Sequence, residues 1–202
     1  MFSTGRNMLL VTAVLGLMFV SLAYGNQVNL NWHKHNNTTC DDSTINGWHT
    51  TSTQRLCKDD DGADPNDVSC NTKLAKSDAT NTTWTYTDGD EVILSTTERD
   101  KAFAGMTRTC AVVTRIAVAG SGFGEWAWHS GGKILMAATA SGIGNVPGVV
   151  LAHEVGHKAG IVGDFGNPGN PPVTDSLRIM NGSISGSEKH VITSEKTSFE
   201  SL

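Results

Sequence analysis

The pattern of hydrophobic and polar residues changes near residue 90 of the chain. Before that point, residues 28–32 (VNLNW) alternate apolar and polar side chains, as a half-buried strand does. Residues 33–90 are polar and rich in Asn, Asp, Ser and Thr, with few apolar runs. The pattern therefore predicts one strand followed by a loop-rich segment that has too few apolar side chains to form a core of its own.

The next part of the chain has clearer periodic patterns. Residues 91–95 (EVILS) and 111–119 (AVVTRIAVA) are rich in β-branched side chains and suit strands. Between them, residues 96–106 (TTERDKAFAGM) predict a short helix with Thr96 or Thr97 as its cap.

Two further elements follow. Glycine-rich turns bracket the apolar run 133–139, which predicts another strand. Residues 146–160 (VPGVVLAHEVGHKAG) have Pro147 near the start and Gly160 at the end, the asymmetry expected of a helix. The order of strands, a helix and then irregular chain predicts an α+β fold, and the length is that of a single domain, which we place at 26–202.

The first 25 residues have the features of a secretory signal peptide. Arg6 precedes an apolar stretch at 8–20, and the small residues Ala23 and Gly25 follow it. The apolar stretch is shorter than the ~20 residues that cross a bilayer. We therefore expect cleavage after Gly25 and a secreted, extracellular or periplasmic protein that has no membrane attachment once the signal is removed.

Export changes how the four cysteines are interpreted, because an oxidising compartment favours disulfides over free thiols. No cysteine pair has the C-x-x-C spacing of a cysteine zinc site. Three pairings are possible, and we favour Cys40–Cys57 with Cys70–Cys110 because the first two flank one short polar loop. Residues 26–90 would then be a part of the domain that disulfides hold in shape.

The net charge of -5 comes without any run of Lys or Arg. This excludes the basic surface on which nucleic-acid binding depends. Within residues 58–67 (KDDDGADPND), Asp59, Asp61 and Asp64 surround Gly62 and offer the hard oxygen ligands that Ca²⁺ prefers. The glutamate that closes an EF-hand is missing, so a solvated acidic loop is the favoured interpretation and a calcium site the alternative.

The helix at 146–160 carries the strongest chemical signal in the chain. His153 and His157 are four residues apart, so on a helix they project from one face with the spacing that two imidazoles need to share a metal. Glu154 follows the first histidine, where its carboxylate can take a proton from a water held by the metal. The apolar VVLA before His153 predicts that the helix is buried, and buried histidines need a partner.

Gly160 lies three residues after the second histidine, where a glycine can adopt positive φ and turn the chain back towards the metal. HEVGHKAG, with SLRIMNGS further on, resembles the metzincin clan of zinc metallopeptidases, whose pattern is HExxHxxGxx, then a third ligand and a methionine-containing turn. The matching residues are His153, Glu154, His157, Gly160 and Met180. The resemblance covers roughly residues 130–200 and implies a twisted mixed sheet, an active-site helix and a small irregular C-terminal subdomain.

The third zinc ligand is the point at which the sequence departs from that pattern. The usual ligand position falls on Gly163, which has no side chain, and the next residue is Asp164. Secreted bacterial peptidases that resemble snapalysin also use an aspartate, so we expect Asp164 to be the ligand. Asp175 is the alternative, since the aspzincin group takes an aspartate from a later segment, but Asp164 closes the site with less chain to order.

These residues together predict a secreted, zinc-dependent metalloendopeptidase, expected to be a monomer, with residues 91–202 as its catalytic part. Its partner would be a protein or peptide substrate, added as a strand to an edge strand at 133–139. The expected substrate-binding residues on that strand are Ile134, Leu135, Met136 and Ala137. The alternative function is a secreted, disulfide-stabilised binding or adhesion module with a structural metal, which would have no use for Glu154 beside the histidines.

Overall fold

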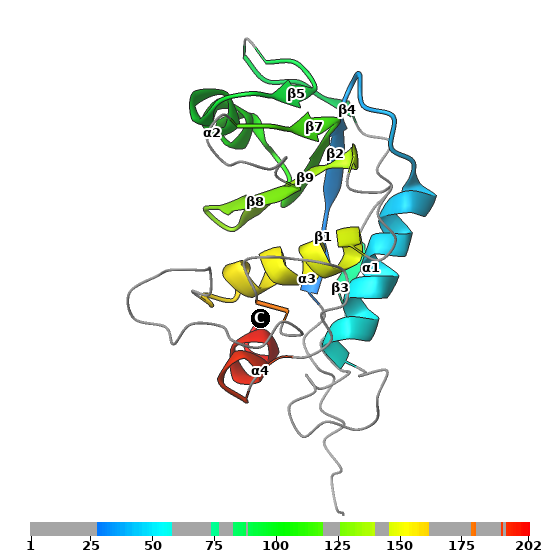
Figure 1. Ribbon diagram of the computed structural model, residues 1–202, viewed down its shortest axis with the longest axis vertical. Coiled ribbons are helices and arrows are strands. Elements are labelled where there is room, and N and C mark those ends of the chain that lie inside the picture. The colour runs from blue at the N-terminus through cyan, green and yellow to red at the C-terminus, as the bar shows by residue number, and fades with distance from the viewer. Residues whose placement is uncertain are drawn as a thin grey trace, which may run out of the picture.

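A twisted five-stranded sheet forms the centre of the molecule, as the computed structural model shows (Figure 1). Its strand order is β4-β2-β6-β9-β8. The first four strands of that order run parallel, and β8 is antiparallel to β9. The five strands are β2 (Trp32–His35), β4 (Thr83–Trp84), β6 (Cys110–Val113), β8 (Ala127–Ser130) and β9 (Lys133–Ala137).

The structure describes residues 28–57, 74–76, 83–87, 89–118, 126–139, 146–161, 179–180, 191 and 193–202. The signal peptide expected at 1–25 lies outside these ranges, as do the calcium candidates Asp59, Asp61 and Asp64. Both candidate third ligands, Asp164 and Asp175, also lie outside the described residues.

Two short parallel ladders flank the central sheet. They pair β1 (Val28–Leu30) with β3 (Leu74–Lys76), and β5 (Val92–Ile93) with β7 (Arg115–Ile116). The fold is therefore α+β, as the order of patterns in the sequence predicts, and its sheet is mixed.

Helices cover both faces of the central sheet, which explains why the β6 residues are buried without alternation. On one face, Cys110 and Val112 of β6 pack with α1 (Asp42–Cys57) and α3 (Val146–Lys158). On the other face, Ala111 and Val113 pack with α2 (Thr96–Gly105). The last helix, α4 (Thr193–Glu200), packs against α3 on the side away from the sheet (Figure 1).

Helix α1 contradicts the prediction that residues 33–90 are loop-rich. The side chain of Asp41 caps it by accepting a hydrogen bond from the amide of Thr44 at 2.8 Å. Five buried side chains recur at helical spacing: Ile45, Trp48, His49, Ser52 and Leu56. Because two of the five are polar, the apolar stripe that predicts an amphipathic helix is interrupted.

Helix α1 lies directly against α3. A Cβ on Gly148 of α3 would overlap the side chain of Thr51 and lie 3.1 Å from the carbonyl oxygen of Trp48. The hydroxyl of Ser52 donates to the carbonyl of Gly148 across the same contact. Gly148 therefore permits the backbone approach that fixes α3 beside α1.

The predicted helix at 96–106 is confirmed as α2, but its cap is different. Ser95 is the N-cap, and its side chain accepts a hydrogen bond from the amide of Glu98 at 3.1 Å. The carboxylate of Glu98 accepts in turn from the amide of Leu94 at 2.8 Å. The side chain of Glu98 thus bonds the amide before the N-cap, and the predicted caps Thr96 and Thr97 instead lie in the first turn of the helix.

Cys40 and Cys110 are free, buried thiols. Burial raises the pKa of both, to about 11 for Cys40. The expected pairings Cys40–Cys57 and Cys70–Cys110 are therefore absent from this structure, and Cys110 instead fills the core from an interior strand. The side chain of Cys57 and all of Cys70 lie outside the described residues. Among the helices that the structure describes, none is long and apolar enough to cross a bilayer.

Candidate metal centre on helix α3

Helix α3 holds the HExxH residues in the interior of the molecule. Every residue from 146 to 156 is buried, because α1, the sheet and α4 pack around the helix. His153 is 5 % and Glu154 7 % exposed, whereas His157, one turn later, is half-buried. Polar side chains in such a position need partners, since a buried polar group without one is costly.

The two imidazoles face each other. Their Nε2 atoms lie 3.0 Å apart, with ring centroids separated by 4.7 Å and ring planes at 87°. Two zinc ligands at the usual bond length and a tetrahedral angle lie ~3.3 Å apart, so the pair is close to the geometry for sharing one ion.

The Nδ1 atom of each ring contacts a backbone carbonyl. His153 Nδ1 lies 2.9 Å from the carbonyl oxygen of Ile179, and His157 Nδ1 lies 2.9 Å from that of Ile161. A carbonyl can only accept a hydrogen bond, so each Nδ1 must be the donor. In the neutral rings, both Nε2 atoms then carry lone pairs that point at each other. The two lone pairs repel each other unless a proton or a metal cation lies between them. Metal-binding histidines have the same arrangement: the nitrogen that does not bind the metal donates a hydrogen bond to a carbonyl or carboxylate.

The turn at Gly160, where the helix ends, places one of these carbonyls, that of Ile161. Its φ of 80° confirms the predicted turn at this glycine. The amide of Ile161 bonds the carbonyl of Gly156, and the amide of Gly160 bonds that of His157, both at 3.0 Å. This is a Schellman motif. It brings the carbonyl of Ile161 back onto the ring of His157, and the chain leaves the helix beside the histidine pair.

The turn Ile179–Met180 lies between α3 and α4 (Figure 1). Met180 is fully buried, and its sulfur packs where a Cβ on Gly156 would be. Because Ile179 accepts from His153, this turn both covers the helix between the histidines and orients one of them. The structure thus brings Met180 to the histidine pair, while its role in a metal site stays a prediction.

The described residues contain no group of three or more His, Cys, Asp or Glu side chains arranged to hold a metal. They supply two imidazoles, and a third ligand would have to come from elsewhere in the chain. Asp164 lies three residues beyond Ile161, in the segment that the structure does not describe. The donor set therefore fits zinc as far as it is described, and the assignment of Asp164 over Asp175 stays a prediction.

The prediction that residues 133–139 form an edge strand is wrong. Strand β9 pairs with β6 on one side and with β8 on the other, so its backbone groups are used within the sheet. The four expected substrate-binding residues, Ile134, Leu135, Met136 and Ala137, are fully buried. A short apolar run fits an interior strand better than an edge strand, because both of its faces are covered.

The strand at this end of the sheet is β8, which lies beside α3 (Figure 1). Lys158, in the last turn of α3, donates to the carbonyl of Gly132 at 3.3 Å. This hydrogen bond links the end of the helix to the turn that joins β8 and β9. The histidine pair is thereby held near a sheet edge that has no paired strand among the described residues.

His129 on β8 is a third histidine at this site, and the sequence interpretation did not include it. Its ring centroid lies 6.2 Å from that of His157, with the planes at 32°. Its Nε2 atom is buried and has no hydrogen-bond partner among the residues that the structure describes. Burial lowers the pKa of His129, and the charges of His157 and Lys158 lower it further. The sequence gives only a weak signal for His129, because its proximity to His157 follows from the order of the strands in the sheet.

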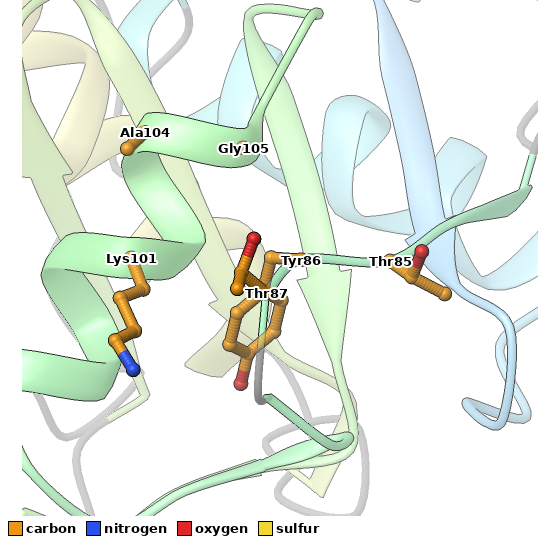
Figure 2. A pocket seen from close by; sticks show the side chains of 6 residues that line it. All are labelled: Thr85, Tyr86, Thr87, Lys101, Ala104 and Gly105. Carbon is orange, nitrogen blue, oxygen red and sulfur yellow. The ribbon is translucent and has the colours of Figure 1, made fainter.

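A pocket of about 520 Å³ lies in a different part of the molecule (Figure 2). Helix α2 supplies three of its lining residues and the chain after β4 the other three: Lys101, Ala104 and Gly105, and Thr85, Tyr86 and Thr87. The pocket is on the α2 side of the sheet and contains none of the three histidines. Its lining offers one charged group and no pair of catalytic groups, so it is not part of the candidate metal centre.

Comparisons of the chain with protein-family models, with curated proteins and with solved structures found no match. The assignment of a function therefore depends on the site itself.

Proposed function

We propose that this protein is a zinc-dependent metalloendopeptidase. The observation that supports it best is the pair of imidazoles whose Nδ1 atoms both face carbonyls, so that both Nε2 lone pairs meet 3.0 Å apart. For two neutral rings with this orientation, the contact is favourable when a cation shares both lone pairs, which is the arrangement of two imidazoles on one metal ion. His153, His157 and Asp164 are the proposed zinc ligands.

The zinc ion, when bound, would lower the pKa of a water molecule and polarise a substrate carbonyl. Glu154 is the proposed base: it follows His153 by one residue on α3, about 100° round the helix, and so is placed beside the metal rather than on it. Its carboxylate would accept a proton from the attacking water and pass it to the departing amine. Burial of Glu154 keeps bulk water from competing for that proton.

The proposed substrate is an extended polypeptide, as in the sequence interpretation, but the strand that receives it is β8. Edge strands bind peptides through main-chain hydrogen bonds. Strand β8 is the sheet edge next to α3, so a peptide added there would pass the histidine pair.

The test is hydrolysis of an unstructured protein such as casein by the purified mature chain. We expect cleavage, its loss on treatment with a chelator and its recovery on addition of about one equivalent of zinc. A protein that binds zinc tightly without any hydrolysis would instead be the binding or adhesion module with a structural metal, and the proposal would be wrong.

A further inference from the structure

We propose that His129 is a further catalytic residue of this centre, which contacts the oxygen of the scissile carbonyl through its Nε2 atom and is not a metal ligand. This inference rests on the proposed function.

The register of the sheet places His129 on the sheet face that packs against α3. In an antiparallel pair, residues directly opposite each other share a face, and His129 is opposite Ile134. Ile134 packs in the core cluster that contains α1 and α3. The neighbouring Trp128 is opposite Leu135 and packs on the other face, where the guanidinium of Arg99 lies 3.9 Å from its ring centroid.

The distance between the rings argues against His129 as a ligand. Two imidazoles that bind one zinc ion at a tetrahedral angle have ring centroids ~5 Å apart, given a metal–nitrogen bond of ~2.0 to 2.1 Å. The pair His153–His157 matches this at 4.7 Å, whereas His129 lies 6.2 Å from His157. His129 therefore lies beside the histidine pair at more than the separation of two ligands of one ion, in agreement with the lack of a group of three ligating side chains among the described residues.

The unpartnered Nε2 atom is the second observation. The atom is buried and finds no partner within the described part of the chain, although a buried nitrogen without a hydrogen bond costs stability. The partner of such a group then comes from outside the described residues, as a water molecule or a bound ligand. A peptide added to the edge of β8 would carry its carbonyl groups past this atom, and a donor that is already in place stabilises negative charge that develops on the carbonyl oxygen.

The test compares His129→Leu, which removes the donor, with His129→Gln, whose amide nitrogen can replace Nε2. Ser130→Ala, one residue along the same strand at an exposed position, is the matched control. For His129→Leu we expect a fall in kcat of ~10² to 10³-fold, the loss typical of one oxyanion donor, with KM changed only a few-fold. His129→Gln should recover part of this loss, and Ser130→Ala should behave as wild type.

Two binding measurements separate a catalytic role from a structural one. The zinc dissociation constant, measured by competition with a chelator, should be unchanged in His129→Leu. The affinity for a phosphinic peptide, whose tetrahedral centre imitates the transition state, should fall by about the same factor as kcat. Weakened zinc binding would identify His129 as a ligand, and unchanged kcat and inhibitor affinity would show a passive residue. Either result overturns the inference while wild-type hydrolysis still supports the proposed function.

Discussion

The Nε2 atoms of His153 and His157 face each other at 3.0 Å, and each ring is held from behind by a backbone carbonyl. The carbonyls come from the glycine turn that ends α3 and from the turn Ile179–Met180. Two separate turns of the chain thus orient the pair. Orientation of this kind raises metal affinity, because fewer side-chain rotations are lost on binding.

Glu154 should be needed for turnover and not for zinc. We expect Glu154→Ala to keep about one zinc per chain and to lose ~10² to 10⁴-fold in kcat, the usual contribution of a general base. Steady-state kinetics on a peptide substrate and metal analysis of the same sample check this. Activity near that of wild type would show that another group is the base.

Asp164 is predicted to complete the zinc site. Asp164→Ala should weaken zinc binding and activity together, whereas Asp164→His should retain some metal because imidazole is also a good zinc ligand. Asp175→Ala is the matched control and should be nearly silent. The opposite pattern, with zinc lost on replacement of Asp175, would transfer the third ligand to that residue and leave the peptidase proposal in place.

Gly156 should be required for the packing of Met180 under the histidines. In Gly156→Ala the new Cβ would overlap the sulfur of Met180 and lie 3.0 Å from Cζ of Phe199. Alanine gains ~1 kcal/mol of helix propensity over glycine. Overpacking costs ~1 to 3 kcal/mol. Two buried side chains must move here, so we expect a net loss of ~1 kcal/mol in the free energy of unfolding, measured by urea denaturation.

Gly47→Ala in α1 is the control for that substitution. Gly47 is exposed, and a Cβ there has no atom within 4 Å. The helix-propensity gain then acts alone, so this variant should be ~0.5 to 1 kcal/mol more stable than wild type. If both variants gained stability, the packing of Met180 on Gly156 would be looser than the structure indicates.

The free energy of unfolding should decrease as the pH falls, because His33 becomes protonated. His33 is a buried residue of β2 that stacks on Trp84. Burial, together with the charges of Arg108 and Lys133, lowers the pKa of His33 from 6.5 to about 4. The unfolded chain then binds more protons between those two values, so stability is fully present above about pH 6.5 and is lost as the pH falls towards 4.

The check is the free energy of unfolding at pH 7 and pH 5, in wild type and in His33→Phe, which keeps an aromatic ring against Trp84. We expect the decrease between the two pH values to be smaller in the variant by ~1 kcal/mol. Equal decreases in both proteins would mean that His33 is solvated enough to titrate normally.

The local elements of the second half could be predicted from the sequence because short-range patterns determine them. The helix α3 and the positive φ of Gly160 follow from the proline and glycine at its two ends, and the short helix α2 follows from its sequence pattern, with a cap one residue earlier than predicted. The spacing of His153 and His157 is likewise a property of one helix. The order of strands is not local, so the sequence does not reveal that strand β9 pairs on both sides and is not an edge strand.

Helix α1 could not be predicted because tertiary packing decides it. His49 and Ser52 occupy buried positions and make hydrogen bonds there, with Trp32 at 2.9 Å for His49 and with Gly148 for Ser52. These partners belong to other elements, so the sequence alone shows only an interrupted apolar stripe. His129 was missed for the same reason, since its proximity to α3 depends on the sheet order.

The most direct test of the metal centre is the zinc content of the purified mature chain after dialysis against metal-free buffer, measured by elemental mass spectrometry. We expect about one zinc per chain in wild type and in His129→Leu, and almost none in His153→Ala or His157→Ala. Wild-type protein without zinc, or zinc that remains bound when both His153 and His157 are replaced, would contradict the account.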